Sequence, residues 1–183
     1  CTGLTSIDLS SLTTLSTEAC NLMFSGCTGL TTVDLSGLTT ISGTKSCYQV
    51  FKGCTSLTSV DLSSLTTISG QQGCQYMFDG CTGLTTVDLS SLTTISGQQA
   101  CFQMFRSCTN LTSISFPALT STSFGGQYVN QFQNMLSGVT GCTLHFPSNL
   151  DPQGGSTVIS GLTGYPNFSG TNTTVLFDLA ATA

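Results

Sequence analysis

The sequence predicts an α/β solenoid, with a parallel β-sheet on one face and short helices on the other. A cysteine recurs at intervals of 26 or 27 residues, and the hydrophobic period changes within each interval from two residues to that of a helix. No single repeat can bury both apolar patterns, so neighbouring repeats must stack. The two cysteine series are Cys1, Cys27, Cys54, Cys81, Cys108 and Cys20, Cys47, Cys74, Cys101.

Each repeat is expected to open with a short strand. In residues 81–107, apolar and polar side chains alternate, which is typical of a strand with one buried face. The inward side chains are Leu84, Val87 and Leu89, and the outward ones are Thr86, Asp88 and Ser90. Leu92 and Ile95 then mark a second short extended segment, so the chain turns once between two strands.

A helix of two to three turns is expected to close each repeat. Cys74, Met77, Phe78 and Cys81 recur at i, i+3, i+4 and i+7, the spacing of an amphipathic helix. Ser69 and Gly70 are suitable entry residues and Gly80 a suitable exit residue. The pattern therefore predicts helices opposite the sheet.

The repeat becomes irregular after Ser115. We expect regular repeats of about 27 residues over 1–115, and a degenerate repeat plus a β-rich C-terminal cap over 116–183, within one continuous solenoid domain. Leu144 and Phe146 indicate one further strand, and residues 173–178 a closing one. Because Cys1 already lies inside the repeating pattern, more repeats or another domain, and any export signal, are expected upstream.

The composition argues against nucleic acid and membranes as partners. The chain has 3 Lys+Arg, 8 Asp+Glu and a formal charge of -5, and roughly a third of it is Ser and Thr. Without a basic cluster it lacks the attraction that drives binding to phosphate backbones or anionic lipid. No apolar run approaches the roughly 20 residues that cross a bilayer.

The repeats resemble leucine-rich repeats of the BspA-like (treponemal) type. Residues 57–62 follow the pattern Leu-x-x-Val-x-Leu, residues 65–68 follow Leu-x-x-Ile, and Met77-Phe78-Asp-Gly-Cys81 closes the unit, in four successive units. The resemblance covers residues 1 to about 119, although this unit carries extra residues around 96–100. It implies a bacterial secreted or cell-surface protein that takes part in adhesion.

Aspartate and hydroxyl side chains occupy the outward strand positions and form the candidate binding face. The carboxylates recur at one repeat position, where they should form a ladder at strand spacing. The set is Asp8, Asp34, Asp61 and Asp88, flanked by Thr32, Ser59, Thr86 and by Ser36, Ser63, Ser90. This ladder could hold a ligand or a cation, or it could simply keep an exposed sheet soluble; calcium prefers six to eight oxygens, which favours the second interpretation.

Aromatic side chains beside the expected helix stripe are candidate contacts. Tyr48, Tyr76 and Phe102 could bind a protein or stack on sugars, or they could pack between neighbouring helices.

The cysteines are expected to be reduced core thiols. Cys74 and Cys81 would lie about 10 Å apart along a helix, too far for a disulfide. The sequence has no paired C-x-x-C ligands for structural zinc, so we expect no metal and no cofactor.

Catalytic groups are also missing from the sequence. The one histidine, His145, is expected to point outward from a strand, and the serines have no base to activate them. A non-enzymatic adhesion module that binds a host or bacterial surface protein is therefore the leading hypothesis. A rigid spacer that displays another domain and a carbohydrate-binding module remain alternatives.

Overall fold

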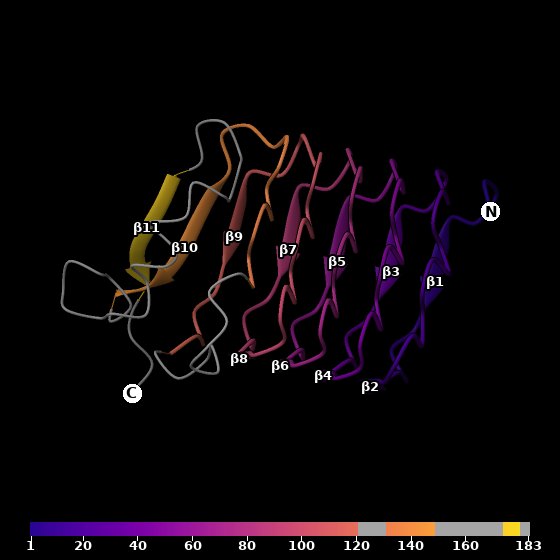
Figure 1. Ribbon diagram of the computed structural model, residues 1–183. Helices are drawn as coiled ribbons and strands as arrows, with labels where there is room; N and C mark the ends of the chain where they lie inside the picture. Colours follow the sequence, from indigo (N-terminus) through magenta and orange to yellow (C-terminus); the bar gives the residue numbers. More distant parts are fainter. Residues whose placement is uncertain (121–130, 149–173, 180–183) are drawn as a thin grey trace.

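The computed structural model describes residues 1–120, 131–148 and 174–179, and it shows about five stacked coils (Figure 1). Each of the first four coils gives one strand to each of two parallel four-stranded sheets. The first sheet is β1 (Ser6–Asp8), β3 (Thr32–Asp34), β5 (Ser59–Asp61) and β7 (Thr86–Asp88). The second is β2 (Thr14–Leu15), β4 (Thr40–Ile41), β6 (Thr67–Ile68) and β8 (Thr94–Ile95).

A third parallel sheet continues the stack toward the C-terminus. Strand β9 (Ser113–Ser115) pairs with β10 (Thr143–Pro147), which pairs with β11 (Thr174–Leu179). Strands therefore form at both C-terminal places where the sequence indicated them. Residues 149–173 and 180–183 lie outside the described residues, so the closing cap and the boundary after residue 115 stay predictions.

Columns of identical or similar side chains fill the interior. One column holds Leu30, Leu57, Leu84 and Leu111, all at most 1% exposed, and another holds Ile41, Ile68 and Ile95 at 0%. Because parallel strands pair in register, each side chain lies above its counterpart in the next coil. Apolar burial between coils, at about 25 cal/mol per Å², therefore supplies the main force that holds the stack together.

The prediction of short helices was wrong for the described residues. The third side of the solenoid is a strip of consecutive turns, which we call the turn strip: residues 17–26, 44–53, 71–80, 98–107 and 131–138. Every fourth residue has a left-handed backbone, as at Gln72 (φ 55°), Tyr76 (φ 57°) and Gly80 (φ 75°). An α-helix does not tolerate such residues at this frequency.

Hydrogen bonding between coils explains why the turn strip is not helical. The N–H groups of Cys74, Tyr76 and Phe78 donate to carbonyls of the next coil at 2.8, 3.1 and 2.9 Å. Strands in the stack lie about 4.8 Å apart, whereas packed helices need roughly 8–10 Å between axes. Linked turns keep the strand spacing on all sides of the solenoid. They still direct Met77, Phe78 and Cys81 into the core. The i, i+3, i+4, i+7 pattern therefore identified the buried residues correctly but not the backbone conformation.

Candidate functional site

The structure brings the four predicted aspartates into one ladder. Asp8 pairs with Asp34, Asp34 with Asp61, and Asp61 with Asp88 across the first sheet. All four are exposed and point away from the inward side chains of the same strands, which are Ile7, Val33, Val60 and Val87. Successive carboxylates therefore lie at about the 4.8 Å strand spacing. The flanking hydroxyl residues Thr32, Ser59 and Thr86 share the same exposed face.

Each aspartate also ends its strand, a role that was not predicted from the sequence. Oδ1 accepts the N–H of the serine two residues later at 2.9 Å in all four coils. This is an Asx turn, and the repeated Asp-Leu-Ser triplet was the signal for it. The Ser63 hydroxyl, and then its N–H, lower the pKa of Asp61; the same groups of Ser10 lower that of Asp8.

Two replacements of Asp61 distinguish the hydrogen bond that it accepts in the Asx turn from the effect of its negative charge. We expect Asp61→Ala to lower the free energy of unfolding by about 0.5–1.5 kcal/mol, because a backbone N–H loses its acceptor. Asp61→Asn keeps an acceptor and should cost less. Urea unfolding of both variants measures the difference, and equal losses would contradict the turn role.

The pH dependence of the same residue has a defined sign. Because folding lowers the pKa of Asp61, its contribution is present above the unfolded value of about 3.9 and is lost as the pH falls through the folded value. Between pH about 3.9 and the lowered pKa of the folded state, Asp61→Asn should lose less stability than the wild type.

A shallow groove of about 380 Å³ lies at one end of the ladder. It is lined by Ser59–Asp61, Thr86–Ser90, Ser113 and Ser115, so it spans β5, β7 and β9. Val60, Val87 and Leu89 give it an apolar floor, and two carboxylates and several hydroxyls give it a polar rim.

The second predicted group, the three aromatic residues, lies together on the turn strip. The rings of Tyr48 and Tyr76 meet edge to face with centroids 6.0 Å apart, and those of Tyr76 and Phe102 at 5.7 Å. All three side chains are half-buried. Lys45 Nζ lies 5.6 Å from the Tyr48 centroid, and Lys52 Nζ lies 5.8 Å from that of Tyr76, both within cation–π range.

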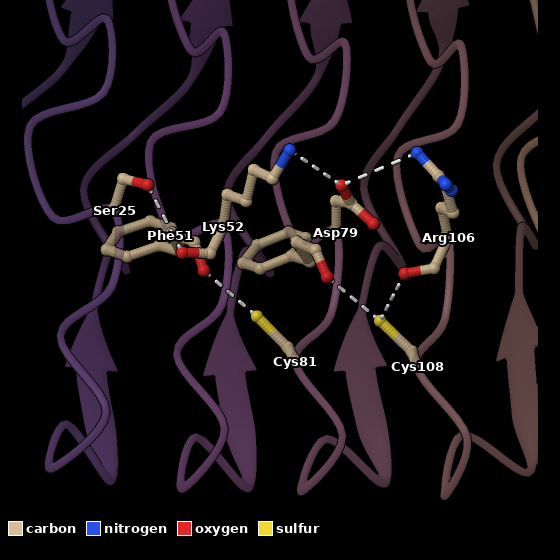
Figure 2. Close-up of polar contacts among 8 residues, drawn as sticks. Ser25, Phe51, Lys52, Asp79, Cys81, Arg106 and Cys108 are labelled. Atoms are coloured by element: carbon tan, nitrogen blue, oxygen red, sulfur yellow. Dashed lines mark hydrogen bonds and ion pairs between the residues drawn. The ribbon is translucent and has the colours of Figure 1, made fainter.

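A charge cluster on the turn strip was not predicted. Figure 2 shows Asp79 between Lys52 and Arg106, with Oδ2 3.2 Å from Lys52 Nζ and 4.0 Å from Arg106. Asp79 is 6% exposed, and its partners come from the coils before and after it. The three residues are 27 apart, so the repeat alignment contained the signal. All three lysine and arginine residues of the chain thus lie on the turn strip, whereas the aspartate ladder has no cation beside it.

The cysteines are free, and most of them are core residues, as the sequence predicted. Cys81 and Cys108 direct Sγ toward the carbonyl oxygens of Phe51 and Phe78 at 3.1 and 3.0 Å (Figure 2). Burial raises the pKa of Cys108 to about 12 and that of Cys54 to about 11. Such thiols remain protonated at neutral pH and react poorly as nucleophiles.

Thiol labelling of the native chain tests this arrangement. At neutral pH we expect a maleimide to modify Cys1, which is exposed, rapidly and Cys20, which is half-buried, slowly. The other eight thiols are buried and should react only in denaturant without reductant. Fewer than ten reactive thiols in denaturant would instead reveal disulfides or bound metal.

Within the described residues, no group of three or more His, Cys, Asp or Glu side chains is placed to hold a metal ion. Strand β10 carries His145, half-buried, in register with Ser115. In the described part of the chain, no helix is both long and apolar enough to cross a membrane.

Comparison with known families agrees with this architecture. The chain matches the BspA type leucine rich repeat region in six copies over residues 44–148, more than half of its length, and it therefore belongs to this family. Members are generally protein-interaction or surface modules, bacterial and secreted or surface-located, and are typically not enzymes. The search of curated proteins found no match.

Proposed function

We propose that this chain is a non-enzymatic, secreted or cell-surface binding module whose aspartate ladder engages a protein partner in adhesion. One observation carries the proposal: four carboxylates stand in register on an exposed sheet that has no cation of its own. One oxygen of each, Oδ1, is used by the Asx turn, which leaves Oδ2 available to a ligand. A partner surface with lysine or arginine side chains would match this face.

The groove across β5, β7 and β9 supports the same face. Its apolar floor offers contact area, and its rim offers carboxylates and hydroxyls as hydrogen-bond acceptors and donors. The rigid stack holds these groups in place before binding, which reduces the entropy lost on association. A flat, repeated surface of this kind suits a protein partner better than a small molecule.

The experiment is binding to a panel of purified extracellular-matrix and bacterial surface proteins, followed by charge reversal. We expect saturable binding that the triple replacement Asp34→Lys, Asp61→Lys, Asp88→Lys abolishes. Replacement of Ser42, Ser69 and Ser96 by Lys, on the second sheet, is the control for added positive charge and should bind as the wild type does. Unchanged binding by the aspartate variant would contradict the proposal.

A rigid spacer is the competing function, supported by the regular stack. In that case the charge reversals would change nothing, whereas deletion of whole 27-residue coils would reduce function in proportion to length.

The turn strip supports a carbohydrate-binding function as a second candidate, because half-buried aromatic rings and cations lie side by side on it. A glycan array probed with the wild type and with Tyr48→Ala, Tyr76→Ala and Phe102→Ala tests it. Glycan binding that these replacements remove would favour this function over the sheet-face proposal.

A further inference from the structure

The second sheet presents a two-dimensional array of hydroxyl groups that the adhesion proposal does not use. Its outward strand residues Thr14, Thr40, Thr67 and Thr94 pair in register. Each is followed two residues later by a serine, and the backbone pairing continues through those serines: the N–H of Ser69 donates to the Ile41 carbonyl at 2.9 Å. We call this array the hydroxyl grid.

The grid has two fixed repeat distances. Coils follow one another at about 4.8 Å, and residues i and i+2 on one strand lie roughly 6.6 Å apart. These distances are close to those that separate water oxygens along the two axes of a prism face of hexagonal ice. Because the strands pair in register over four coils, the match repeats along the stack rather than occurring once.

The chemistry of the grid also suits crystalline water. A hydroxyl both donates and accepts hydrogen bonds, as a lattice water does. Ser42 and Ser69 are exposed, and among the described residues their Oγ atoms have no protein partner. The grid carries no ionised side chain, whereas the first sheet carries the aspartate ladder and the turn strip carries all the lysines and arginines. An uncharged face complements an uncharged lattice, since it does not order water around ions.

Neighbouring groups keep the grid rigid. Thr39, Thr66 and Thr93 lie beside it, and their Oγ1 atoms donate to carbonyls of the preceding coil at 3.0, 3.1 and 3.1 Å. Those hydroxyls fix the coils to one another. Within the grid, the Oγ1 atoms of Thr40 and Thr67 lie 3.5 Å from those of Thr39 and Thr66, and both threonines are half-buried. The exposed hydroxyls of Ser42 and Ser69 remain for the ligand. Preorganisation matters here because each hydroxyl–water contact is weak on its own.

We propose that the hydroxyl grid binds the surface of ice. The wild-type chain should produce thermal hysteresis and shaped ice crystals in a nanolitre osmometer. Thr67→Tyr places a bulky ring at the centre of the grid and should remove most of the hysteresis. Thr86→Tyr, the matched change at an exposed strand position of the first sheet, should retain it.

Thermal unfolding of both variants shows whether each is folded. If Thr67→Tyr fails to fold, Ser69→Lys on the grid and Ser63→Lys on the first sheet replace the pair, because Ser69 is exposed and Ser63 is partly exposed. A wild type without hysteresis or crystal shaping overturns the proposal. Equal losses of hysteresis in the grid and control variants also overturn it.

Discussion

Phe78→Ala is expected to lower the free energy of unfolding by about 3–5 kcal/mol, the range for loss of a fully buried aromatic side chain. Phe78 is 0% exposed and lies between Phe51 and Phe105, with ring centroids 5.7 and 5.6 Å away and nearly parallel planes. Removal of its ring leaves a cavity in a stack that cannot collapse locally, because hydrogen bonds hold the coils on either side.

Two variants provide the comparison. Phe24 stands at the end of the same stack and is half-buried, so Phe24→Ala should cost clearly less. Phe102, half-buried on the turn strip, should also cost less when replaced by Ala. Urea unfolding of the three variants gives the order, and an equal cost for Phe24 and Phe78 would show that the stack does not depend on interior burial.

Gly70→Ala is expected to destabilise the fold by about 3 kcal/mol or more, beyond the usual range for an added methyl group. A Cβ at Gly70 would lie 2.1 Å from the Gly43 carbonyl oxygen and 2.7 Å from its carbon. Both atoms belong to the backbone of the preceding coil, so no side chain can move aside. The coils would have to separate at this corner.

Two other glycines separate this steric effect from backbone strain. Gly26 has a φ of 74° but an added Cβ there meets nothing within 4 Å, so Gly26→Ala should cost only about 1–2 kcal/mol, from the left-handed conformation. Gly3 has neither constraint, and Gly3→Ala should be close to neutral. If the three replacements were equally tolerated, close contact between coils would not be the reason for glycine at position 70.

The repeat length, the inward residues and the strand positions could be predicted from the sequence because burial fixes them. Val60 and Leu62, for example, are inward in any stack of 27-residue coils. The conformation of the turn strip could not be predicted from the sequence, because the pattern of buried residues is the same in a helix and in linked turns. Cys74, Met77, Phe78 and Cys81 fit both. Only the distance between coils distinguishes the two, and that distance is a property of the stack.

For the candidate surfaces too, the positions of residues could be predicted from the sequence, whereas the contacts between side chains could not. Repeat positions were enough to place the aspartate ladder in one column. They did not reveal that Asp61 accepts a hydrogen bond from Ser63, nor that Lys52 and Arg106 both approach Asp79, because these contacts depend on side-chain direction. Whether the ladder binds a protein is a separate question, which the charge-reversal experiment addresses.

The central claim is that the turn strip is bonded from coil to coil rather than within a helix. The most direct measurement is the NMR scalar coupling through a hydrogen bond at the Phe78 amide. The structure places this N–H 2.9 Å from the Met104 carbonyl oxygen, so a coupling between the Phe78 nitrogen and the Met104 carbonyl carbon is expected. A coupling to the Cys74 carbonyl carbon, four residues earlier, would reveal an α-helix and contradict the account.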